Sequence, residues 1–174
     1  MTHTFNDTHD RARALAAWEE ALSEEGCERG QNDANLSPSQ DNFVTLSTRI
    51  PLSRLSVSER MDTASWEQWF QNEILMHKKD GCGREEHFLR MLASETVDEE
   101  VVVGCYSATS SETSDQVSFH LWDGWHRTAC SAIRRETSIP ALLVITPQLL
   151  PQILKDLGLQ HDLEWQPEIE SLAP

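Results

Sequence analysis

Basic residues are scarce in this sequence. It has 14 Lys and Arg residues against 29 Asp and Glu residues, which gives a formal net charge of −15 at pH 7. Proteins that hold DNA without sequence preference, or that lie on anionic membranes, need a cationic surface. We therefore expect neither of these binding modes, although a small local site for phosphate is compatible with an acidic chain.

Cysteine is also sparse. The sequence has four cysteines and no C-x-x-C pair: Cys27, Cys82, Cys105 and Cys130. This spacing fits neither a disulfide scaffold nor a zinc ribbon, and we expect reduced thiols. His77, Cys82 and His87 form an H-x4-C-x4-H array. Zinc would need a fourth ligand and the spacing matches no common zinc motif, so we do not expect a zinc site there.

Long hydrophobic runs are missing. No apolar stretch approaches the ~20 residues that a membrane-spanning helix needs. The first ten residues are polar and lack the apolar core of a secretory signal. We expect a cytoplasmic protein with no membrane partner. A chain of 174 residues is long enough to bury a sizeable core without disulfides or metal.

The pattern of charge divides the chain into three parts. Residues 1–44 contain nine acids and three bases. Within them a helix is expected over Thr8–Glu25, followed by a polar linker at Gly30–Asn42. Residues 45–160 carry the pattern of one compact domain. Residues 161–174 hold four acids, no bases and two prolines, and form an acidic tail.

Strand and helix patterns alternate in the compact domain. We expect strands at 46–50, 117–122 and 139–145, and another that opens at 101–103 and precedes a Ser/Thr-rich loop at 106–115. Helices are expected at 65–80, 84–92, 126–135 and 147–157. The apolar run at 139–145 is too continuous for a strand with one solvent face. These elements predict an α/β (α+β) domain with a small mixed sheet and surrounding helices, preceded by an acidic helical extension.

The most informative segment lies between the third and fourth expected strands. A strand ends near Asp123, Gly124 allows a tight turn, and a helix begins at Trp125 or His126. Helix N-termini attract anions, because their first amides have no intrahelical partner and the helix dipole is positive there. His126 and Arg127 add side-chain donors at the same place. Asp123 suits either a helix cap or a Mg²⁺ ion carried by a phosphate.

This segment resembles the signature of the ParB/sulfiredoxin superfamily. Members of that superfamily typically carry D-G-x-H-R or a related sequence at this turn, then a helix, then Ile-Pro and a strand. Here the matching residues are Asp123–Ala129 and Ile139–Ala141. Upstream, Ile50–Leu55 resembles the "IPLSxL" opening of the same domain. The resemblance spans about residues 46–158 and is strong at its two ends.

The resemblance implies nucleotide chemistry, because in this superfamily the turn and the helix start hold the phosphates of ATP, ADP or CTP, usually with magnesium. Gly124, His126 and Arg127 would be the phosphate contacts by position. Arg54, Trp125 and Thr128 complete the candidate site, where Trp125 would stack on a base or cover the site, with plain packing as the alternative. Asp123, His126 and Arg127 would be the catalytic residues, and Asp123 would be the ligand of Mg²⁺.

The chain departs from the superfamily at Trp125. Sulfiredoxin has its reactive cysteine at this position, and chromosome-partitioning ParB proteins have glutamate. The departure argues against peroxiredoxin repair and against a CTP switch. Cys130, five residues further along the expected helix, does not replace the missing cysteine. The remaining relatives are small stand-alone members, namely amino-acid kinases and plasmid or phage proteins, some of which are ATPases and nucleases that block conjugative transfer.

The sequence thus predicts a nucleotide-binding protein that hydrolyses ATP or transfers its phosphoryl group with Mg²⁺. Nuclease activity stays open, although an acidic surface disfavours nucleic acid unless metal supplies positive charge. The alternative is a non-catalytic acidic protein that mimics DNA and binds a basic protein partner.

Overall fold

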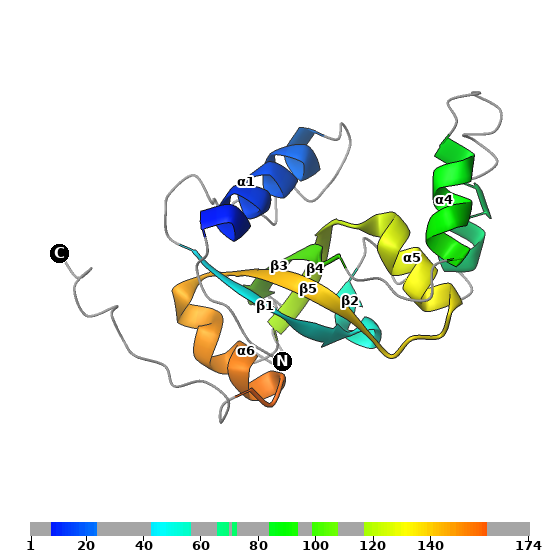
Figure 1. Ribbon diagram of the computed structural model, residues 1–174. Helices are drawn as coiled ribbons and strands as arrows, with labels where there is room; N and C mark the ends of the chain where they lie inside the picture. The colour runs from blue at the N-terminus through cyan, green and yellow to red at the C-terminus, as the bar shows by residue number, and fades with distance from the viewer. Residues whose placement is uncertain are drawn as a thin grey trace.

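The computed structural model describes residues 8–23, 43–56, 66–69, 71–72, 84–93, 99–107 and 117–159. Five strands form one mixed sheet in the order β1-β5-β3-β4-β2 (Figure 1). They are β1 (Val44–Pro51), β2 (Leu55–Ser56), β3 (Val101–Ser107), β4 (Val117–Asp123) and β5 (Ser138–Ile145). The pairs β1–β5 and β3–β4 are antiparallel, and β3–β5 and β2–β4 are parallel. The expected α/β class with a mixed sheet is confirmed.

One face of the sheet is covered by α5 (Trp125–Ile133) and α6 (Leu150–Asp156). Helix α6 follows a short 3₁₀ turn at Pro147–Leu149, and α4 (Arg84–Ala93) packs against α5. The core on this face joins sheet residues such as Phe119 and Leu143 to small residues of α5 such as Ala129. All residues from Ala141 to Ile145 are buried, which confirms that this strand has no solvent face.

Helix α1 (Thr8–Ser23) covers the opposite face of the sheet (Figure 1). Its small buried residues Ala14 and Ala17 pack in one cluster with Trp122 and Val144. The Arg11 guanidinium donates a 2.9 Å hydrogen bond to the Phe43 carbonyl and lies 4.4 Å from the centre of the Phe43 ring. The sequence places this helix in an extension outside the compact domain, whereas in the structure it contributes to the core.

Trp122 forms a β-bulge near the end of β4. The pairing register shifts between Val102 and Val103, so that Asp123 pairs with Val102 and Leu121 pairs with Val103. Trp122 is the additional residue on β4, and its indole lies over Gly104, where a side chain would come within 2.4 Å of the ring. Such a bulge changes the direction of a strand at its end. It directly precedes the turn into α5.

Most expected elements are present with small shifts of their ends. The helix expected at Thr8–Glu25 is observed over Thr8–Ser23, and the helix expected at 126–135 over Trp125–Ile133. Strand β3 extends to Ser107, into a segment expected to be a loop. The two-residue strand β2 and the 3₁₀ turn Leu52–Arg54 are not predicted, because neither is long enough to show a periodic pattern.

Other expected features fall outside the described residues. They are the linker at 30–42, most of the segment 57–83 with His77 and Cys82, and the acidic tail 161–174. Residues 66–69 and 71–72 are helical, in agreement with the helix expected from residue 65. Within the described ranges, no helix has the length and apolar character to cross a membrane.

The packing of α1 predicts a contrast between two alanines of the same helix. Ala14 is fully buried and Ala16 is exposed. Ala14→Asp should lower the free energy of unfolding by about 3 kcal/mol or more, because it places an unpaired carboxylate in the core. Ala16→Asp should lower the free energy of unfolding by about 0.7 kcal/mol, because aspartate has a lower helix propensity than alanine. Urea unfolding followed by tryptophan fluorescence measures both, and equal losses would contradict the packing of α1 on the sheet.

Candidate anion-binding turn

The turn from β4 into α5 depends on a glycine. Gly124 has φ 98° and ψ 26°, the left-handed conformation that residues with a side chain rarely adopt. A Cβ atom at this position would lie 2.5 Å from Cγ1 of Val101. Both the backbone angles and the contact with β3 therefore require glycine. We use the name "Gly124 turn" for residues 123–127.

Helix α5 begins directly at this turn. The Thr128 amide donates to the Gly124 carbonyl at 2.8 Å, which is the first intrahelical hydrogen bond. The amides of residues 125–127 precede that bond at the start of the helix, and the N-cap residue is a glycine, which has no side chain to accept from them. This arrangement suits an anion. Thr128 is buried, and its hydroxyl donates to the Gly124 carbonyl at 3.0 Å, so this implied phosphate contact faces its own helix.

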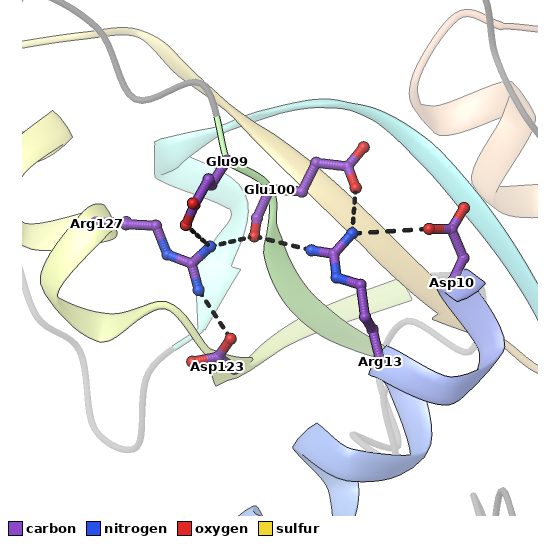
Figure 2. Close-up of polar contacts among 6 residues, drawn as sticks. All are labelled: Asp10, Arg13, Glu99, Glu100, Asp123 and Arg127. Atoms are coloured by element: carbon purple, nitrogen blue, oxygen red, sulfur yellow. Dashed lines mark hydrogen bonds and ion pairs between the residues drawn. The ribbon is translucent and has the colours of Figure 1, made fainter.

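Arg127 turns back toward the sheet instead of extending into solvent. Its Nη2 donates to Oδ2 of Asp123 at 2.8 Å, and its Nη1 donates to the Glu100 carbonyl at 2.7 Å (Figure 2). Nη1 also lies 3.4 Å from a carboxylate oxygen of Glu99. Asp123, Gly124 and Arg127 thus lie together at the turn, with the Arg127 guanidinium bound to the Asp123 carboxylate. A phosphate at the turn would have to compete with the Asp123 carboxylate for this guanidinium.

Aromatic residues form the other side of the turn. The rings of Trp66, Trp69 and Trp125 lie with their centres 5.9–6.1 Å apart. The His126 ring lies 5.2 Å from Trp69. Trp66 is buried, while Trp69, Trp125 and His126 are half-buried. His126 is therefore held between the start of α5 and an indole from a helix about 57 residues earlier in the chain.

Arg54, one of the candidate site residues, contacts α6 and the middle of β4 and not the Gly124 turn. Its guanidinium pairs with Asp156 of α6 at 3.3 Å and lies 5.2 Å from the centre of the Phe119 ring. Since β2 pairs with β4 at Phe119, four residues before Asp123, about 13 Å of strand separates Arg54 from the turn. The structure does not bring Arg54 to the implied phosphate site, because the upstream segment pairs with the middle of β4 and not with its end.

Carboxylates that could bind metal are few at this site. Among the described residues, no group of three or more His, Cys, Asp and Glu side chains is arranged to hold a metal ion. At the turn itself Asp123 is the expected ligand, and its Oδ2 carries the hydrogen bond from Arg127. One carboxylate fits a Mg²⁺ ion that is held mainly by substrate phosphates, and it does not fit a metal site made by the protein alone.

The thiols of the core have no nucleophilic character. Cys105 and Cys130 are fully buried. Burial raises the pKa of Cys130 from 9.0 to about 11 and raises that of Cys105 still further. A thiol is a nucleophile only as its thiolate. Cys130 faces the core from α5, so it does not replace the reactive cysteine that sulfiredoxin carries at the position of Trp125.

Glu100 and Arg13 also lie at the site, although the sequence does not indicate them as contacts of Arg127. Glu100 belongs to the acidic run 98–100, which the sequence favours as a solvated face with a general base or a Mg²⁺ ligand as the alternative, and Arg13 lies in the extension. In the structure both meet Arg127 through the Glu100 carbonyl (Figure 2). No signal in the sequence indicates these contacts, because they join positions 27 and 87 residues apart.

The turn predicts unequal costs for two glycine substitutions. Gly124→Ala should lower the free energy of unfolding by about 3 kcal/mol, since it combines a left-handed backbone with a collision against Val101. Gly158→Ala is the matched control. Gly158 has φ +70° but nothing within 4 Å of the added carbon, so the loss should be about 1 kcal/mol. Chemical denaturation of both variants measures the difference, and similar losses would contradict the close contact with Val101.

The burial of Cys105 and Cys130 predicts that they react slowly with thiol reagents and that the stability of the protein depends on pH. In a Cys27→Ser/Cys82→Ser variant, Cys105 and Cys130 should react with a thiol reagent at pH 8 only after unfolding. Because the native pKa of Cys130 is raised from 9.0 to about 11, the unfolded chain loses this proton first. Stability should therefore fall as pH rises above 9 toward 11. Rapid labelling of the folded variant would contradict this burial.

Comparisons of the chain with protein-family models, with curated proteins and with solved structures give no match. Its function must therefore be argued from the geometry of the Gly124 turn and from the motif that the sequence carries.

Proposed function

We propose that this chain binds a nucleotide through its phosphates at the Gly124 turn. The observation that carries the proposal is the left-handed glycine that opens a nine-residue helix beside an arginine. A helix start presents main-chain amides and the positive end of the helix dipole, both of which stabilise an anion. Arg127 can bind phosphate oxygens through two nitrogens at once.

The placement of the motif segments supports the resemblance to the ParB/sulfiredoxin superfamily. The Asp123–Ala129 segment spans a strand end, a turn and a helix start. The two Ile-Pro segments, far apart in the sequence, pair side by side in β1 and β5, with Ile50 opposite Ile139. The Leu52 amide also donates to the Thr137 carbonyl at 3.1 Å. Each segment that carries the resemblance thus contributes residues to the same sheet.

In the proposed complex, Arg127 exchanges the Asp123 carboxylate for a phosphate oxygen. The main-chain amides of residues 125–127 and the His126 ring complete the donor set. Asp123, once released by Arg127, would be the residue that holds a Mg²⁺ ion, and the ion would supply charge that neutralises the phosphates. Hydrolysis of ATP or transfer of its phosphoryl group would follow from electrostatic stabilisation of the moving group, which needs positioning more than covalent chemistry.

One observation favours the alternative of a non-catalytic acidic protein. The cationic group at the turn is already bound to an aspartate and a main-chain carbonyl of its own chain. Such a turn can persist as a structural element while the acidic surface, with a net charge of −15, binds a basic protein partner. The two functions differ in whether phosphate competes successfully with Asp123.

Calorimetric titration with MgATP and with tripolyphosphate tests the proposal. Wild type should bind both, and Arg127→Ala should weaken binding by about tenfold or more, the loss of a charge-assisted hydrogen bond pair. The matched control is Arg49→Ala. Arg49 likewise donates to a main-chain carbonyl at 2.7 Å, that of Ser138, but it lies on the edge strand β1, three strands away from β4. Its variant should bind as wild type does.

Folding of each variant is checked by thermal unfolding, so that a loss of binding is not confused with a loss of structure. Absence of binding by folded wild type would overturn the proposal. Salt-sensitive binding of a basic polypeptide in the same experiment would then favour the acidic interaction protein. If Arg127→Ala and Arg49→Ala weaken nucleotide binding equally, the site does not lie at the Gly124 turn.

A further inference from the structure

Glu100 lies between two arginines that come from opposite sides of the sheet. Its carbonyl accepts from Arg127 Nη1 at 2.7 Å and from Arg13 Nη2 at 3.3 Å. Its carboxylate accepts from Arg13 Nη1 at 2.9 Å. Asp10, one helical turn before Arg13, adds a weaker contact at 3.7 Å. Figure 2 shows the resulting chain of polar contacts from Asp123 through Arg127, Glu100 and Arg13.

This chain of contacts joins two helices that do not share a face of the sheet. Helix α1 packs by Ala14 and Ala17 on one face, and α5 packs by Ala129 and Cys130 on the other. Glu100 immediately precedes β3, so its main chain is fixed at the end of the central part of the sheet. The Arg13 and Glu100 side chains are 30% and 23% exposed, which limits screening by solvent.

We infer that Arg13 is a positioning residue for Arg127, acting through Glu100, and that docking of α1 is thereby linked to anion binding at the Gly124 turn. The inference rests on the proposed function for its ligand. Arg13 neutralises the Glu100 carboxylate and shares the carbonyl that holds Arg127. Without Arg13, the Glu100 carboxylate beside the turn has lost the positive charge that neutralises it. The Glu100 carbonyl then accepts from one arginine, Arg127, instead of two. The first effect repels a phosphate, and the second holds Arg127 on the carbonyl more firmly.

The linkage must act in both directions. When a phosphate draws Arg127 away from the Glu100 carbonyl, that carbonyl is left to Arg13, and α1 is held more tightly. A bound polyphosphate should therefore slow the hydrogen exchange of the α1 amides. In this way the exchange rates of the acidic N-terminal helix depend on whether the turn holds an anion.

The decisive experiment compares polyphosphate affinity in four variants, with tripolyphosphate and MgATP as probes. Arg13→Ala should weaken binding about fivefold or more. Arg11→Ala is the matched control, since Arg11 also fixes α1 through a main-chain carbonyl, that of Phe43, but does not reach Glu100. It should leave the affinity within about twofold. Glu100→Gln should not weaken binding, and adding Arg13→Ala to it should cost less than Arg13→Ala costs in wild type, because the charge that Arg13 neutralises is gone and the shared main-chain carbonyl is left as its one effect.

Hydrogen exchange of wild type, with and without saturating tripolyphosphate, supplies a readout that does not depend on the folding of any variant. Slower exchange at Ala14 and Ala17 is the expected result. If wild type binds the probes while Arg13→Ala and Arg11→Ala behave alike, the linkage is wrong and the proposed function stands. The linkage is also wrong if the α1 amides are unaffected by bound probe. If folded wild type binds neither probe, both proposals fall.

Discussion

The contact between Gly124 and Val101 is the constraint on which the rest of the site depends. Strand β4 can end and α5 can begin within one residue only because position 124 has a left-handed backbone and no side chain. The bulge at Trp122, whose indole packs on Gly104, directs the end of β4 toward Val101. A side chain at position 124 would separate α5 from β3 and would remove Arg127 from its acceptors.

The electrostatics of the turn follow from the acidity of the chain. With about two acids for every base, an arginine near the sheet is easily surrounded by oxygen acceptors. Arg127 has three of them, two from carboxylates and one from the main chain. This pairing fixes the guanidinium at the helix start in the absence of ligand. It also lowers the apparent affinity for an anion, since a ligand must replace the Asp123 carboxylate before it gains the full contact.

Local patterns in the sequence predict most of the fold. The apolar run at 139–145 predicts a buried central strand, and the alternation at 117–122 predicts β4, because a period of two is visible within single segments. The Gly124 turn is predicted for the same reason, since glycine between a strand and a helix is a local signal. The packing of α1 is not predicted, because Ala14 and Ala17 give only a weak apolar face and the acidic residues of that helix dominate its composition.

The composition of the site is less predictable than its location. Arg54 fails to reach the turn because β2 pairs with the middle of β4, a register that two residues cannot encode by pattern. Glu100 and Arg13 reach it through contacts between distant segments. Trp69 has the helical spacing of a core residue and also lies against His126. In each case the tertiary arrangement decides the role, and the residue type alone does not.

The phosphate site is best tested by a titration of the isotopically labelled protein with MgATP, followed by amide chemical shifts in NMR. Binding at the Gly124 turn predicts that the largest saturable shifts occur at the amides of residues 125–127, with smaller shifts at Glu100 and in α1. Saturable shifts confined to other parts of the chain, or no shifts at millimolar nucleotide with an intact spectrum, would contradict a phosphate site at the start of α5.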